Sequence, residues 1–168
     1  MALCDYAMVP EWLPTRATAR GRLVLTALEQ FGARGFDAVN VVELARDAET
    51  TTGPLYHHFG SKLGLYDIVR GDVERRLTDR MEGALAAQPA LAPALVVAFD
   101  YALRAGFLRL AGEPHPAGGG DPIVTLLTER AGAPLGVMLA AAWRQGLLAC
   151  ADGAAPAKVR DAMRTLTS

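Results

Sequence analysis

The chain has 168 residues, of which 51% are hydrophobic and 21% charged, and its formal net charge is −1. These values exclude a largely disordered protein, because such chains contain too few apolar residues to form a core. They also give no general indication of nucleic-acid binding, for which a strongly basic chain would be expected. Evidence for a function therefore has to come from local motifs.

The chain start and the cysteines predict a soluble, cytoplasmic protein. Residues 1–15 are expected to be a tail without the apolar segment of a signal peptide. The longest weakly polar stretch, 136–143, is too short to span a membrane, so no membrane partner is expected. Cys4 and Cys150 have no CxxC partner or suitably spaced histidine, which predicts unpaired thiols, no metal site and no cofactor.

The first predicted helix covers residues 16–34, and Gly35 is a suitable residue to end it. Its apolar residues recur every three or four positions, so they share one helical face. Residues 41–48 form a second, short helix. Asn40 is its expected N-cap, and Glu43 three residues later completes the pattern of a capping box.

The remaining elements are also predicted to be helical. A short helix begins at the cap Thr51 and buries Leu55 and Phe59 in the core, so its opposite side faces outward. Ser61 caps a long helix that ends at residues 88–89. The later segments are a second long helix at 91–111, a glycine-rich loop at 112–122, helices at 122–131 and 134–150, and a last helix from Pro156.

Residues 40–59 fit a helix-turn-helix, because two short helices joined by a tight turn follow a longer first helix. The second short helix presents Thr51, Thr52, Gly53, Tyr56 and His57 outward. Small residues at its N-terminus allow the backbone to approach base edges. The free N–H groups and the helix dipole there favour a phosphate.

Residues 36–45 and 51–62 resemble the TetR family of transcriptional regulators. The most specific part is Leu-Tyr-x-His-Phe-x-x-Lys, and the resemblance covers about the first 65 residues. It implies an all-α fold, with a three-helix, homeodomain-like helix-turn-helix domain at 16–61 and a helical ligand-binding and dimerisation body at 62–168. The implied DNA-binding residues are Asn40, Thr51, Thr52, Gly53, Pro54, Tyr56, His57 and Lys62. Of these, Tyr56 and Lys62 would contact phosphates. The residues that would face the major groove are Thr51, Thr52, Gly53, Pro54 and His57.

The turn of the motif departs from the family. Glu49 and Thr50 stand where the family usually has Gly-Val, and a side chain at a position that favours positive φ costs about 1 kcal/mol. Glu49 also places a negative charge near the DNA phosphates. His57 is expected to face the groove and His58 to pack against the body. For the arginines at 16, 20 and 22, a solvated face and a basic arm that meets DNA remain equal alternatives.

The resemblance and the motif together predict a dimeric transcriptional repressor. It would bind a palindromic operator in double-stranded DNA and be released by a small apolar or aromatic inducer. The candidate ligand-binding residues are Phe99, Leu103, Phe107, Met138 and Trp143, each with core packing as its alternative.

The homodimer is expected to form through the C-terminal helices, on an apolar stripe of Leu135, Leu139, Trp143 and Leu147. Val137, Met138, Ala141 and Leu148 widen this face, and the last helix adds Val159, Met163 and Leu166. The alternative is that these faces close the core of a monomer. No catalytic motif is found, so an enzyme is not expected. The alternative function is a ligand-binding or protein-interaction module of the same fold that no longer binds DNA, and the expected location is the bacterial cytoplasm, at the nucleoid.

Overall fold

The computed structural model describes residues 15–167, so the predicted tail at 1–14 and Cys4 lie outside the described residues. Within residues 15–167 all regular elements are helices, as the sequence predicts, and none is long and apolar enough to cross a membrane. The helices are α1 (Ala19–Arg34), α2 (Val41–Asp47), α3 (Thr52–Phe59), α4 (Lys62–Ala87), α5 (Leu91–Ala105), α6 (Leu108–Gly112), α7 (Pro122–Ala131), α8 (Leu135–Ala151) and α9 (Pro156–Leu166).

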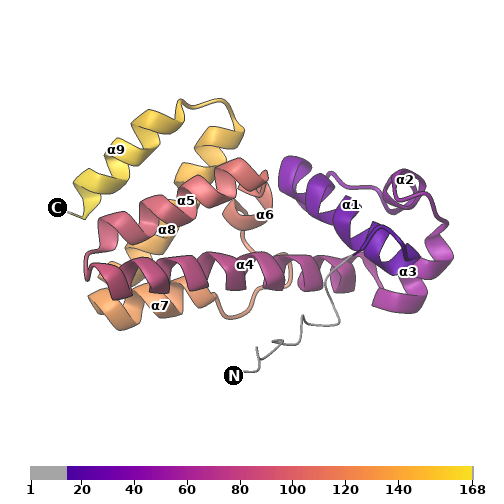
Figure 1. Cartoon of the computed structure of the whole chain (residues 1–168), viewed down its shortest axis with the longest axis horizontal. Coiled ribbons are helices and arrows are strands. Elements are labelled where there is room, and N and C mark those ends of the chain that lie inside the picture. The colour runs from indigo at the N-terminus through magenta and orange to yellow at the C-terminus, as the bar shows by residue number, and fades with distance from the viewer. Residues whose placement is uncertain (1–14, 168) are drawn as a thin grey trace, which may run out of the picture.

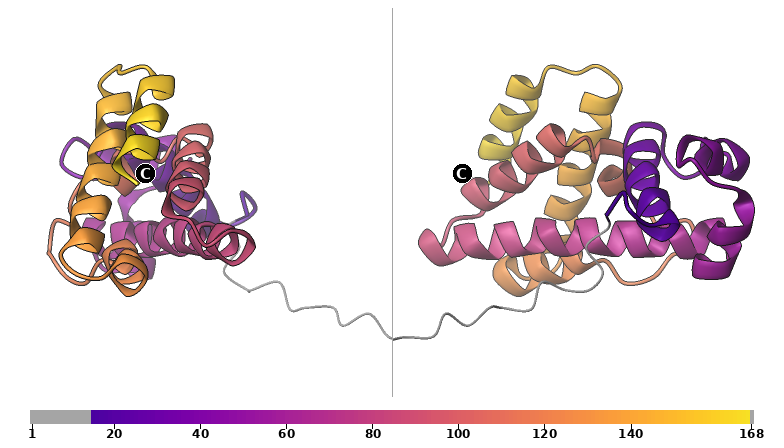
Figure 2. Two further views of the ribbon diagram at one scale, coloured as in Figure 1. Left: turned by 90° about the vertical axis from the view of Figure 1, so that its left-hand side faces the viewer. Right: turned by 45° about the vertical axis from the view of Figure 1, so that its right-hand side comes forward.

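The molecule has a small head, α1 to α3, and a larger body, α4 to α9, with α4 running from the head along the body (Figure 1). Helix α1 packs on α4 and on α6, so the head rests on two elements of the body. Helix α9 packs on α5 and α8 at the end of the body away from the head (Figure 2). The head is therefore connected to the body both through the chain and through packing.

The predicted caps explain where several helices begin. The Asn40 side chain accepts hydrogen bonds from the N–H groups of Val42, at 2.8 Å, and Glu43, at 3.3 Å. Ser61 accepts from the N–H of Gly64 at 2.9 Å. The reciprocal half of the capping box is not formed, because the Glu43 carboxylate pairs with Arg34 instead. Helix α1 also begins later than predicted, at Ala19, because Thr18 provides its N-cap.

The single helix predicted at 91–111 is two helices. Gly106 has φ +76° and ends α5, and α6 then turns toward α1. The close approach explains the break, because a Cβ on Gly32 of α1 would lie 2.3 Å from the carbonyl oxygen of Gly106. Sequence periodicity favoured one long helix, and only the packing of the head on the body shows why the chain bends here.

The apolar stripe predicted on α8 for dimerisation mostly belongs to the chain's own core. Leu139, Trp143 and Leu147 are buried, and the Trp143 indole N–H donates to the carbonyl of Leu95 at 3.0 Å. Of the predicted stripe only Leu135 is exposed. The large apolar residues exposed on α8 and α9 are Leu135, Val137, Met138 and Leu166, so an interface on these helices would use only the exposed part of the expected surface.

Candidate functional site

The turn between α2 and α3 has the unusual backbone that the sequence indicated. Glu49 has φ +52°, and no other non-glycine residue in 15–167 has positive φ. The turn is held from α1, because the Arg22 guanidinium donates to the carbonyls of Ala48, at 2.9 Å, and Glu49, at 3.4 Å. Arg22 thus has a structural contact within the head. Arg16 pairs with Glu29 on the surface.

Helix α3 presents its polar side to solvent. Leu55 and Phe59 are buried beneath it, and Tyr56 is 53% exposed. The side chain of Thr51 makes no capping hydrogen bond, which leaves its hydroxyl available to a partner. His57 is exposed as expected. The prediction that His58 packs against the body is wrong, because His58 is also exposed and its ring lies 5.0 Å from that of His57.

The start of α3 is open to a close approach. A Cβ on Gly53 would meet only the Thr51 hydroxyl oxygen, at 3.7 Å, so the surface around this residue is free of other atoms. Thr52 and Pro54 are partly buried beside it. An exposed surface of this kind, with hydroxyls and a helix N-terminus, suits contact with a nucleic-acid groove and its phosphates.

Lys62 is the first residue of α4 and follows the end of α3 after Gly60 and Ser61. Its ammonium lies 4.3 Å from the centre of the Phe36 ring, a cation–π contact that holds the side chain in place. Burial lowers the pKa of Lys62 below its ordinary value, and the nearby Asp37 carboxylate opposes this. A positioned lysine at the corner of the motif is suited to a phosphate contact.

Charge on the head is nearly balanced. Residues 16–62 contain six basic and five acidic side chains. Glu29, Glu43 and Asp47 each pair with an arginine. Asp37 and Glu49 make no ion pair with any residue in 15–167, and Glu49 lies in the turn that precedes α3. The local charge is therefore less favourable to DNA than that of a strongly basic surface.

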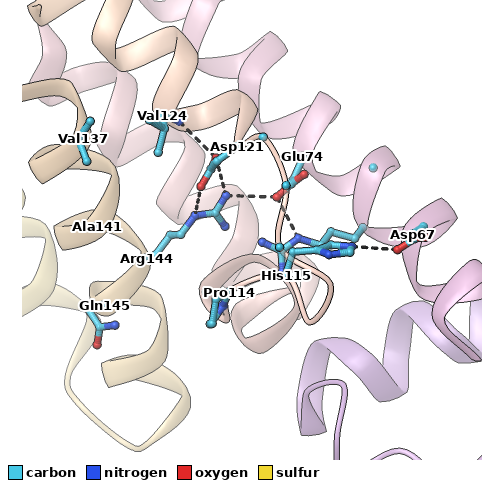
Figure 3. Close-up of a pocket in the computed structure, with 16 residues that line it drawn as sticks. Asp67, Glu74, Pro114, His115, Asp121, Val124, Val137, Ala141, Arg144 and Gln145 are labelled. Atoms are coloured by element: carbon cyan, nitrogen blue, oxygen red, sulfur yellow. Dashed lines mark hydrogen bonds and ion pairs between the residues drawn. The ribbon is translucent and has the colours of Figure 1, made fainter. Parts of the chain in front are cut away.

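The body contains a cavity of about 780 Å³ between α4, α7, α8 and the loop 113–121 (Figure 3). Charged side chains form much of its wall, and Val124, Val137 and Ala141 form an apolar part. Figure 3 shows Arg144 of α8 between Asp121 and Glu74, and His115 of the loop beside Asp67 of α4. In 15–167 no cluster of histidine, cysteine, aspartate and glutamate is suited to a metal ion.

Two buried arginines organise this wall. Arg144, 8% exposed, donates from Nε to Asp121 at 2.8 Å and from Nη2 to Glu74 at 3.2 Å. Arg70, 3% exposed, donates from Nε to Glu74 at 2.9 Å and from Nη1 to the Tyr66 hydroxyl at 2.8 Å. Each buried cation is thus paired and hydrogen-bonded, as burial of a charge requires.

The pairing also determines the pKa values in the wall. Burial raises the pKa of Asp121, but hydrogen bonds from Arg144 and from the backbone at the start of α7 outweigh this effect, and the pKa lies below its ordinary value. Burial lowers the pKa of Arg70, but Glu74 and Tyr66 outweigh it, and the pKa lies above its ordinary value. These groups therefore stay ionised at neutral pH.

The same arginines connect the pocket to the head. Arg144 donates to the carbonyl of Ala111 in α6, and Arg70 donates to the carbonyl of Glu113, at 2.7 Å. The Glu113 carboxylate in turn accepts from the N–H of Phe36, at 3.3 Å, in the head. A Cβ on Gly35 would lie 2.3 Å from that carboxylate. A continuous set of contacts thus runs from the pocket wall to the connector between α1 and α2.

None of the five predicted ligand-binding residues lines this pocket. Phe99 and Trp143 are fully buried, Phe107 is nearly so, and Leu103 packs against the core, whereas Met138 is exposed. Sequence analysis missed Arg70, Glu74 and Arg144. Arg70 and Glu74 are four residues apart on a helix, a spacing typical of a solvated ion pair, so no local signal distinguishes them.

Comparison with known proteins gives a family match for the head. Residues 23–69 match the model of "Bacterial regulatory proteins, tetR family". No curated protein matches the chain. A crystal structure of a protein described as a TetR-family transcription regulator from Shewanella sp. PV-4 superposes with a TM-score of 0.63 at 21% identity, over 89% of this chain and 96% of that one.

A second solved structure, a TetR-family regulator from Streptomyces coelicolor A3, is 17% identical and covers 92% of this chain and 94% of that one, with a TM-score of 0.46. The family match and the Shewanella structure confirm the predicted resemblance and the predicted fold, a helix-turn-helix head with a helical body.

Proposed function

We propose that this chain, which has the fold of TetR-family transcription regulators, is a homodimeric repressor released from a DNA operator by a small molecule. The observation that carries the proposal is the exposed face of α3, within the segment that matches the family model. Thr51, Gly53, Tyr56 and His57 are open to solvent there, and Lys62 at the start of the next helix is held over the Phe36 ring. Asn40, Thr52 and Pro54 complete the proposed DNA-binding surface.

The proposed role of Lys62 is to bind a phosphate. On a duplex enriched from a random pool, Lys62→Ala is expected to weaken binding to all sequences about equally. It should reduce the slope of log affinity against log salt by about one unit, the amount for one lost phosphate contact. Mobility-shift titrations at several salt concentrations measure this. A changed sequence preference with an unchanged salt slope would contradict the assignment.

Glu49 is expected to weaken DNA binding both by its charge and by backbone strain. Glu49→Gln removes only the charge and should strengthen binding severalfold at low salt, because the proposed phosphates lie near the turn. Glu49→Gly should give the same gain in affinity and also relieve the positive φ, worth about 1 kcal/mol before the entropy of the added glycine.

Paired urea-unfolding and DNA-binding titrations of these two variants separate the contributions. A lower free energy of unfolding for Glu49→Gly than for Glu49→Gln would show that the turn carries no strain, because nothing would then offset the entropy of the added glycine. Unchanged affinity in both would place Glu49 away from the phosphates.

A second copy of this chain is the proposed partner of α8 and α9. One short recognition helix contacts only a few base pairs, so two heads on a palindrome are needed for specific binding. Leu135 and Met138 on α8 and Leu166 on α9 are large apolar side chains left exposed. A shallow groove of about 330 Å³ between the two helices, lined by small residues such as Ala142 and Ala162, allows close approach of another helix.

Release by a ligand is supported by the contacts between pocket and head. A ligand that engages the Arg70–Glu74–Arg144 wall competes for groups that hold Ala111 and Glu113. Since Glu113 also holds the backbone of Phe36, a shift of this segment changes how the head sits on the body. Ligand binding then favours a form in which the two heads no longer match the operator.

A protein-interaction module without DNA binding is the second candidate. Asp37 and Glu49 favour it, because both carboxylates lie in the head and neither forms an ion pair with a residue in 15–167. A salt titration with any duplex distinguishes the candidates. A DNA-binding protein loses affinity steeply as salt rises, whereas an interaction module shows no affinity to lose.

A further inference from the structure

The pocket wall contains cations and anions in balance. Arg70 and Arg144 are each paired with Glu74, and Arg144 also with Asp121. At the rim, His115 Nε2 lies 2.8 Å from Asp67. The Ala117 N–H donates to His115 Nδ1, so Nε2 is the ring nitrogen left to donate to Asp67. No cation in the wall is left without an anion.

Two side-chain atoms of this wall form no hydrogen bond with any residue in 15–167. Arg70 uses Nε and Nη1, and its Nη2 donates to no residue in 15–167. Glu74 uses Oε1 for both arginines, and its Oε2 accepts from none. Within residues 15–167, the buried side-chain nitrogen and oxygen atoms that have no hydrogen-bond partner are Gln30 Oε1 and Thr128 Oγ1. Neither Nη2 nor Oε2 is sealed, and both residues line the pocket, which offers a ligand one donor and one acceptor.

The rest of the pocket determines the size and polarity of the part of a ligand that does not contact Arg70 and Glu74. Val124, Val137 and Ala141 form an apolar side, and no aromatic ring other than the His115 imidazole lines the cavity. A Cβ on Gly71, between Arg70 and Glu74 in the pocket, would meet nothing within 4 Å, so the space in front of α4 is empty. The wall thus offers a polar centre next to an aliphatic surface.

We propose that the effector is a neutral molecule with an aliphatic body and a polar end that both accepts and donates hydrogen bonds, as a carboxamide does. Its oxygen accepts from Arg70 Nη2 and its N–H donates to Glu74 Oε2. A carboxylate would face the charges of Glu74, Asp121 and Asp67, and an ammonium would face Arg70 and Arg144. This inference rests on the proposed regulatory role of the pocket and replaces the apolar or aromatic inducer expected from the sequence.

Three probes with one ring test the proposal on the full chain: cyclohexanecarboxamide, cyclohexanecarboxylate and cyclohexylmethylamine. Thermal unfolding is followed as each is titrated. The carboxamide should raise Tm by about 3 °C once it is well above its Kd, and the two ions should raise it far less. A larger shift with either ion, or no shift with the carboxamide, would overturn the proposal.

Variants show whether the response comes from this wall. Glu74→Gln keeps an acceptor for both arginines but removes one negative charge, so the preference should change from the carboxamide to the carboxylate. Gly71→Leu should abolish the carboxamide shift by filling the space. Gly83→Leu, on an open surface of the same helix outside the pocket, is the matched control and should keep it. An unchanged preference in Glu74→Gln, or a retained shift in Gly71→Leu, would place the carboxamide elsewhere.

DNA binding is measured separately, without any probe. A wild-type chain that binds an enriched duplex but shows no carboxamide shift disproves the ligand class and leaves the DNA-binding function standing. A chain whose Tm rises with the carboxamide but that binds no duplex disproves the repressor function and leaves the proposed ligand class standing.

Discussion

Replacing Gly53 with leucine is expected to lower affinity for the operator by about 100-fold or more while leaving the fold intact. The new side chain would stand on the face of α3 proposed to enter the groove, where it holds the backbone away from the base edges. The head should tolerate it, because a Cβ at this position meets only the Thr51 hydroxyl. Leucine is also a better helix former than glycine, so the free energy of unfolding should not fall.

Mobility-shift titration and urea unfolding measure the two quantities. Gly83→Leu makes the same change at an exposed position of α4, far along the chain from the head, and should leave DNA affinity unchanged. Operator affinity retained in Gly53→Leu would remove α3 as the recognition helix. A large loss of stability would instead show that the open space beside Gly53 is filled in solution.

Replacing Met138 with glutamate is expected to convert the proposed dimer into monomers that do not bind a full palindrome tightly. Met138 is 63% exposed on α8, so a carboxylate there costs little in the monomer but is desolvated in the proposed interface. Light scattering at micromolar protein gives the oligomeric state, and the same samples are titrated with DNA.

Two controls separate the interface from the core. Leu139→Glu, one residue further, places a charge at a position that is 4% exposed and should unfold the chain. Val97→Glu adds the same charge on a partly exposed site of α5, outside the proposed interface, and should leave both dimer and DNA binding unchanged. A Met138→Glu variant that remains a dimer, or a wild-type monomer with full palindrome affinity, would contradict this interface.

The sequence by itself determined the local features of this protein. Asn40 and Ser61 begin their helices because each side chain reaches N–H groups two or three residues away. The positive φ of Glu49 and the outward position of Tyr56 follow from a turn and a helix that are each only a few residues long. Such features depend on near neighbours in the chain, and the family resemblance rests on the same short segment.

The tertiary structure decided the features that join distant residues. The break at Gly106 depends on contact with Gly32, about seventy positions earlier, and the burial of Leu139 and Trp143 depends on which neighbours cover α8. Arg70 and Glu74 have the spacing of a surface pair, and only the approach of Arg144 makes them a pocket wall. Helical periodicity shows which residues share a face, but it does not show what that face meets, because packing partners are set by the whole chain.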